Sequence, residues 1–226
     1  MDLQQVEHLD AQGRALLRCT LREGVMEGSL EQIDSKTGAL FRANFRAGQL
    51  EGPMSVHDAS GALAQSCCYQ GGQVHGVMKV FEKGRCVSQQ QYLNGRLHGP
   101  SITFDEAGQP LARLQFSEGV LEGPSEFFHE GQRVRLAHYH RGVLEGESTD
   151  FTRDGTAVQT CTYRANRLHG PLRRYWPNGE LMQETHYRVG VPYGASIQRD
   201  AQGRDIEATA GKPTWIERVR FWVRGG

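Results

Sequence analysis

Apolar residues along this 226-residue chain fall in short segments, and a glycine-containing turn closes each of them. In one representative stretch, residues 99–104 form a first segment, a turn follows at 105–108, and a second segment covers 111–116. Segments of about six residues are too short for helices and match the usual length of β-strands. Strands that short turns join in sequence pair antiparallel, so the pattern predicts a succession of β-hairpins.

The segments and turns recur with a period of 23 or 24 residues. A five-residue motif, Gly-x-Leu-x-Gly in its commonest form, begins at positions 24, 48, 72, 95, 119, 142, 166 and 190. Its middle position forms an apolar column of Met26, Leu50, Val74, Leu97, Leu121, Leu144 and Leu168. Self-similarity at a short fixed period means that each unit is one supersecondary element stacked on its neighbours. We therefore predict an all-β fold, an elongated single-layer antiparallel sheet of tandem hairpin repeats.

Two aromatic columns support this phasing. Three residues before each following motif stand Phe45, Tyr69, Tyr92, Phe116, Tyr139, Tyr163 and Tyr187. Five residues after the second glycine stand Ile33, His57, Phe81, Phe104, Phe128, Phe151, Tyr175 and Arg199. Equivalent positions in adjacent hairpins lie roughly 10 Å apart, a gap that large side chains bridge in part. We expect the first column and the motif column to form the ladder of a thin core. The five aromatics from Phe81 to Tyr175 are a candidate contact column for a partner.

The repeat divides the chain into three parts. Residues 1–23 resemble a partial unit that caps one end, because a terminal unit meets water on one face, and residues 24–210 form the array. The period fails in residues 211–226, which include Trp215, Arg218, Arg220 and Trp222. Apolar spacing in this tail fits a helix face, while alternation with arginine fits a strand, so both conformations stay open. Its role is open too: a cap on the end of the sheet, or a surface anchor for a membrane or a partner.

Composition narrows the class of partner. Twenty-six basic residues balance 26 acidic residues, so no net field draws the surface toward nucleic acid. The N-terminus shows no basic and apolar leader, and no run of about 18 apolar residues occurs, so we expect a cytoplasmic protein. Five cysteines at positions 19, 67, 68, 86 and 161 lack metal-binding spacing. We expect them to be reduced thiols that pack as small hydrophobes.

The sequence contains no motif that predicts catalysis or a cofactor. The histidine spacing would hold His138 and His186 about 20 Å apart, too far to share a metal ion. The fourth motif position is the remaining candidate site, a rim of Glu27, Glu51, His75, His98, Glu122, Glu145, His169 and Tyr193. This rim is either a solvated edge or a strip that faces a protein partner. If the strip binds a partner, replacing Glu122 or His98 by alanine should weaken binding and leave stability nearly intact.

The repeat unit resembles the MORN repeat, most closely its bacterial variant, in which the aromatic residue precedes the motif. Residues 92–100 (Tyr-Leu-Asn-Gly-Arg-Leu-His-Gly-Pro) and 163–171 carry the resemblance, which extends over about residues 13–205. Asn166 replaces the first glycine, Pro192 replaces the leucine, and the tail has no counterpart in the family pattern. The resemblance implies an elongated, twisted sheet. Many bacterial members are antitoxin or immunity proteins.

Three classes of function follow. The favoured one is a non-enzymatic protein-binding module, an immunity or antitoxin protein that neutralises a cognate bacterial toxin or secreted effector. An extended sheet without an active site suits the occlusion of another protein. The alternative is a peripheral membrane adaptor that uses the Trp-rich and Arg-rich tail. An enzyme is disfavoured, because no residue pattern calls for one.

Overall fold

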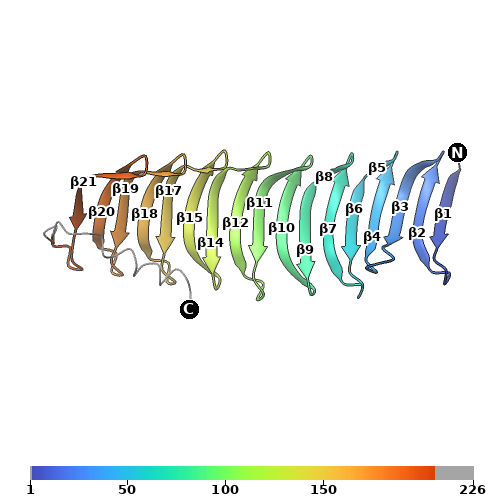
Figure 1. The fold of residues 1–226 in the computed structure, drawn as a ribbon, viewed down its shortest axis with the longest axis horizontal. Helices are drawn as coiled ribbons and strands as arrows, with labels where there is room; N and C mark the ends of the chain where they lie inside the picture. The colour runs from blue at the N-terminus through green and yellow to red at the C-terminus, as the bar shows by residue number, and fades with distance from the viewer. Residues whose placement is uncertain (1, 207–226) are drawn as a thin grey trace.

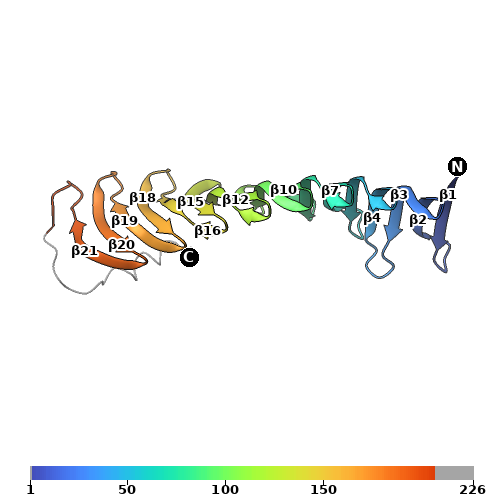
Figure 2. The same ribbon diagram turned by 90° about the horizontal axis from the view of Figure 1, so that it is seen from above.

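The computed structural model describes residues 2–206, which form one open antiparallel sheet a single layer thick. Figure 1 shows the strands side by side along one long axis, and Figure 2 shows that the array twists and that its hairpins curve. Every pairing joins strands that are close in sequence, from β1 with β2 to β20 with β21. The described residues contain no α-helix, and so no helix that could cross a membrane. The predicted hairpin array is confirmed.

The strands follow the predicted period, with two long strands in each repeat. They are β1 (Leu3–Leu9), β2 (Ala15–Arg22), β3 (Val25–Ile33), β4 (Leu40–Arg46), β5 (Gln49–Leu50), β6 (Gly52–His57), β7 (Leu63–Gln70), β8 (Gln73–Val74), β9 (Gly76–Glu82), β10 (Arg85–Leu93), β11 (Arg96–Phe104), β12 (Pro110–Ser117), β13 (Val120–Leu121), β14 (Gly123–His129), β15 (Gln132–His140), β16 (Val143–Leu144), β17 (Gly146–Phe151), β18 (Ala157–Arg164), β19 (Arg167–Tyr175), β20 (Leu181–Arg188) and β21 (Val191–Gln198).

One backbone hydrogen bond recurs at each joint between repeats. The N–H of the first motif residue donates to the carbonyl of the apolar residue in the preceding motif, as from Gly48 to Met26 at 2.9 Å and from Gly119 to Leu97 at 2.7 Å. Asn166 makes the same bond to Leu144 at 3.1 Å, and its side-chain Oδ1 also accepts the Leu144 N–H at 2.7 Å. Asn166 adopts φ 63°, so it replaces glycine without breaking the joint.

The two faces of the sheet differ in chemistry. One face carries a central row that contains every buried residue of the described chain: Cys19, Leu30, Ala43, Met54, Cys67, Ser101, Ser125, Ala137, Ser148, Cys161 and Leu172. We call this the packed face. The opposite face carries cross-strand ion pairs such as Arg42 with Glu31 (2.7 Å) and Arg173 with Glu184 (2.6 Å), and we call it the ion-pair face. The thin core is therefore one row deep.

The expected aromatic and apolar ladder lies on the packed face above the central row. Each aromatic residue that precedes a motif stands directly opposite the apolar residue of that motif, as Phe45 faces Leu50, Tyr139 faces Leu144 and Tyr163 faces Leu168. All seven aromatics are half-buried. Cross-strand pairs of this kind stabilise sheets, and Phe45, Leu50, Tyr69 and Val74 pack against the buried residues of the central row. The predicted ladder therefore borders the buried core, which is formed by other positions.

The second glycine of the motif lies within a strand and not in the hairpin turn. The hairpin turn is made by Asn94 (φ 49°) and Gly95 (φ 78°), whereas Gly99 (φ 100°) lies inside β11. The register of β10 against β11 shifts between Gln90 and Tyr92, opposite this glycine. Gly99 therefore permits a β-bulge, which bends the strand. The positive φ of Gly99 therefore belongs to the bulge and not to the hairpin turn.

Asp turns close the opposite ends of several hairpins. In the tip at 58–61, Asp58 Oδ1 accepts the N–H of Ser60 at 2.8 Å, the Ser60 hydroxyl at 2.6 Å and the N–H of Ala62 at 3.0 Å. The bond from the Ser60 hydroxyl contributes most to holding the pKa of Asp58 below its usual value, and the bond from the Ala62 N–H contributes next. Similar turns begin at Asp10 and Asp200, so the N-terminal unit uses the turn chemistry of the array.

Candidate interaction surfaces

Half of the candidate rim residues join one repeat to the next. Glu27, Glu51, Glu122 and Glu145 each use Oε2 to accept a backbone N–H at 2.8 Å, from residues 47, 71, 141 and 165 respectively. Each of these N–H groups belongs to the turn that opens the following motif. A carboxylate bond to a backbone N–H is charge-assisted and stronger than a neutral one. These four side chains are clamps between repeats, whatever else they contact.

The other rim positions make no such clamp among the described residues. Nδ1 of His75 and of His98 is buried without a hydrogen-bond partner, and Nδ1 of His98 lies 3.7 Å from Oε1 of Glu118. Tyr193 is 49% exposed, and the Arg188 guanidinium lies 5.5 Å from its ring centroid. The rim is therefore chemically uneven: clamps occur at the first, second, fifth and sixth motifs, and histidine or tyrosine stands at the other four.

The clamp changes one expectation from the sequence. Glu122 accepts the N–H of Arg141 and lies 2.8 Å from Nδ1 of His140. The bond from the Arg141 N–H contributes most to lowering the pKa of Glu122, and the contact with His140 contributes next. Replacing Glu122 by alanine should therefore reduce stability, which corrects the expectation of a neutral effect. Partner contact by the rim stays a prediction.

The candidate contact column is half-buried from Phe81 to Tyr175. Two of its members, Phe128 and Phe151, contact arginines of the ion-pair face. The Arg113 guanidinium lies 5.9 Å from the ring centroid of Phe128, and that of Arg133 lies 4.8 Å from Phe151. Arginine over an aromatic face is a favourable arrangement. These rings already have partners within the sheet, and their contact with another protein stays a prediction.

A polar network on the packed face was not found from the sequence. It belongs to a lower row, nearer the Asp turns, that crosses the array from β2 to β21: Leu17, Gln32, Phe41, Val56, Gln65, Val80, Ser88, Thr103, Ala112, Phe127, Arg135, Asp150, Gln159, Arg174, Gln183 and Gln198. From Leu17 to Phe127 every member is uncharged. From Arg135 onward the row is polar throughout.

Hydrogen bonds connect the polar part of the lower row across neighbouring strands. Nε of Arg135 lies 3.1 Å from Oδ1 of Asp150, and Gln159 donates to Oδ2 of Asp150 at 3.3 Å. Burial raises the pKa of Asp150, and Arg135 opposes that shift. Arg174 donates from Nε to Gln159 at 3.1 Å and from Nη1 to Gln183 at 3.2 Å. The network is preformed in the free chain.

One comparison with known proteins matches the C-terminal end of the array. Residues 168–188 match a family model described as the MORN repeat variant. The matched segment is the hairpin of β19 and β20, which carries Arg174. No curated protein matches the chain. This segment is thus similar to the MORN repeat variant, in agreement with the resemblance drawn from the motif.

Similarity to solved structures is weak. A mutant of S. aureus TarM in complex with fondaparinux, alpha-GlcNAc-glycerol and UDP is 15% identical, with a TM-score of 0.32, over 42% of this chain and 19% of that chain. Another TarM crystal structure is 14% identical, with a TM-score of 0.33, over 47% of this chain and 21% of that chain. The chain spans about a fifth of the length of these structures, and such low TM-scores carry no argument.

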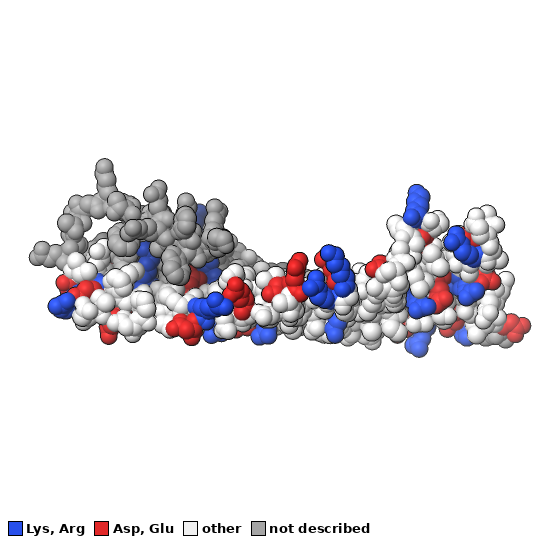
Figure 3. Space-filling model, turned by 90° about the horizontal axis from the view of Figure 1, so that it is seen from below, with Lys and Arg blue, Asp and Glu red and all other residues white. Residues whose placement is uncertain are grey.

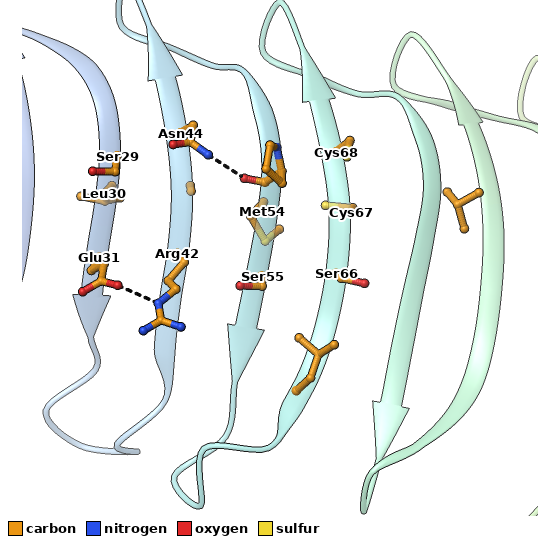
Figure 4. Close-up of a pocket in the computed structure, with 14 residues that line it drawn as sticks. Ser29, Leu30, Glu31, Arg42, Asn44, Met54, Ser55, Ser66, Cys67 and Cys68 are labelled. Carbon is orange, nitrogen blue, oxygen red and sulfur yellow. Dashed lines mark hydrogen bonds and ion pairs between the residues drawn. The ribbon is translucent and has the colours of Figure 1, made fainter.

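Charged side chains and one depression characterise the surface of residues 2–206. In Figure 3, basic and acidic side chains are intermixed on the visible face. A depression of about 530 Å³ lies over β3, β4, β6 and β7, and Figure 4 shows its Arg42 paired with Glu31 and its Asn44 bonded to the Pro53 carbonyl. No group of three or more metal-ligating side chains occurs in residues 2–206. The polar groups of Arg42, Glu31 and Asn44 therefore bond to neighbouring strands of the sheet.

The cysteines and the tail complete the predicted sites. Cys19, Cys67 and Cys161 are buried in the central row as expected, whereas Cys68 is exposed. Burial raises the pKa of the Cys67 and Cys161 thiols, so these groups stay protonated at neutral pH. The tail residues Trp215, Arg218, Arg220 and Trp222 lie outside the described residues, and so does the membrane contact predicted for them.

Proposed function

We propose that this chain is a non-enzymatic protein-binding module that acts in the cytoplasm as an immunity or antitoxin protein. In this proposal it binds and neutralises a cognate bacterial toxin or secreted effector. The MORN repeat variant supports a repeat module used for binding, and the motif's resemblance to bacterial immunity-type proteins supports the finer assignment. The proposal includes no cofactor and no nucleic-acid partner.

The observation that carries the proposal is the shape of the molecule. Its accessible surface is 15387 Å² for a mass of 25.2 kDa, whereas a compact monomer of that mass exposes about 10,000 Å². A standard protein interface takes about 800 Å² from each partner, so the sheet can accommodate one without rearrangement. Within residues 2–206 the conspicuous polar clusters are joints, cross-strand pairs and the lower-row network, and binding is the use that this arrangement supports best.

Co-expression tests the proposal. The product of the neighbouring gene is expressed from an inducible promoter in a host that lacks this chain, with and without the chain supplied from a second plasmid. Survival only when the chain is present supports neutralisation, and co-purification of the two proteins shows that binding is the means. If cells die even though the soluble chain is abundant on an immunoblot, the immunity assignment is wrong.

A further inference from the structure

Two consecutive arginines in β19 have opposite surroundings. Arg173 lies on the ion-pair face, with Nε 2.6 Å from Oε2 of Glu184. Arg174 lies on the packed face, where it stands opposite Gln159 on one side and Gln183 on the other. Within residues 2–206 no carboxylate forms an ion pair with Arg174, and its two hydrogen-bond acceptors are neutral amides. Its positive charge therefore has no described counter-charge.

The two amides hold the guanidinium in one orientation. Gln159 donates its own amide N–H to Asp150, so its oxygen is the atom turned toward Arg174. Gln183 donates to Oγ1 of Thr185 at 3.4 Å and to Oγ of Ser196 at 3.3 Å, which likewise turns its oxygen toward Arg174. Each amide is thus fixed from its far side. A guanidinium held in this way loses little conformational freedom when it binds a ligand.

Arg174 has further donors without a partner among residues 2–206. A guanidinium has five N–H groups. Two of them are used, by Nε and by one hydrogen of Nη1, which leaves three without a described partner. The residue is only half-buried, so solvent reaches the site. Planar, charge-assisted pairing with an anion is the interaction that such a fork favours.

We propose that Arg174, held by Gln159 and Gln183, is a receptor for a carboxylate side chain of the partner protein. This inference rests on the proposed function as a protein-binding module and assigns the packed face at β18 to β20 as a contact surface. A single guanidinium between neutral amides matches one negative charge. A phosphate dianion needs more positive charge and fits less well. The other arginine of the network, Arg135, is already paired with Asp150. The Asp150 carboxylate lies two strands from Arg174, about 10 Å away, and adds a negative charge near the site.

An NMR titration of the full-length protein tests the site without the partner. The probe is a hexaglutamate peptide at low ionic strength, with hexalysine and inorganic phosphate as separate arms. We expect chemical-shift changes centred on the Arg174 Nε–H and on the side-chain amides of Gln159 and Gln183, and weakening as salt is added. Hexalysine should leave these signals unchanged, and phosphate should shift them less than the peptide does.

Opposite-face variants control for general electrostatics. Arg174→Gln should weaken hexaglutamate binding about tenfold or more, and Arg174→Lys should weaken it in part, because lysine keeps the charge and loses the fork. Arg173→Gln removes the same charge one residue away and should leave the affinity within about twofold. Equal losses in both glutamine variants, or shifts that gather on the ion-pair face, would overturn the inference. A stronger response to phosphate would replace the carboxylate with a phosphate ligand.

The titration and the co-expression test fail independently. If co-expressing cells survive but hexaglutamate causes no chemical-shift change at Arg174, this receptor is rejected and the proposed function remains. Death of those cells combined with specific hexaglutamate shifts at Arg174 would reject the immunity role and keep an acidic-protein contact on the packed face. The wild-type Arg174 resonance also gives an answer if Arg174→Gln does not fold.

Discussion

Replacing Gly99 by alanine tests how the bulge glycine shapes the array, and Gly123 supplies a matched control at the same motif position. Both backbones are left-handed, with φ of 100° at Gly99 and 94° at Gly123. An L-residue in such a conformation costs about 1–2 kcal/mol. This contribution is shared by the two sites, so it cancels when the two variants are compared.

The surroundings of the added methyl group differ between the two sites. At Gly99 the new Cβ would lie 3.1 Å from Cγ and 3.2 Å from Cβ of Gln91, whereas at Gly123 the nearest atoms, in Gln115, lie at 3.7 and 3.9 Å. Carbon atoms pack best at about 3.5–4.0 Å. The Cβ of Gln91 is fixed to its strand, so Gly99→Ala must shift the backbone, at a further cost of about 1–2 kcal/mol. We expect totals of about 2–4 kcal/mol for Gly99→Ala and about 1–2 kcal/mol for Gly123→Ala.

Urea unfolding followed by circular dichroism measures the difference, and hydrogen exchange of peptides from β10 and β11 locates it. Repeat arrays can unfold in parts, so the exchange data decide whether the loss is local. Equal midpoints for the two variants would refute the contact argument. If neither midpoint differs from that of the wild type, the assignment of strained φ angles is wrong.

Three further outcomes follow from the joints and the turns. Glu145→Ala removes the carboxylate that accepts the Ala165 N–H, so it should lower stability by about 0.5–1 kcal/mol and speed hydrogen exchange at that amide. The reverse change, His75→Glu, offers a clamp to the N–H of Asn94 and should raise the melting temperature; a lower melting temperature would count against the clamp. The pKa of Asp58 is lowered in the folded state, so its contribution to stability is complete above its unfolded value, about pH 4, and is lost as the pH falls through the folded value. Melting curves from pH 6 to pH 2 should therefore show a shallower acid slope for Asp58→Asn.

The period, the strands and the packed ladder could be predicted, because they rest on local signals. Gly95 and Tyr92 recur at fixed spacing, and hairpins stacked at that spacing bring equivalent residues together. The role of Glu51 could not be predicted, because its acceptor bond to the Gly71 N–H joins residues 20 positions apart and depends on the bulge geometry. Alternation alone places Arg173 and Arg174 on opposite faces, but it does not tell which of the two lies on the packed face. That assignment also depends on the register shift between Cys161 and Tyr163.

The clamps between repeats affect how rigidly the Arg174 site is held. A receptor needs fixed neighbours, and the lower-row network spans strands that separate repeats contribute. Two of the joints beneath it are clamped, by Glu122 to the N–H of Arg141 and by Glu145 to the N–H of Ala165. The middle joints, at His75 and His98, have no such clamp among the described residues. The joint at His169, which the network crosses between Gln183 and Gln198, likewise has no clamp among residues 2–206. The polar network therefore crosses two clamped joints and one without a clamp, and the two clamped joints are those on the Asp150 side of Arg174.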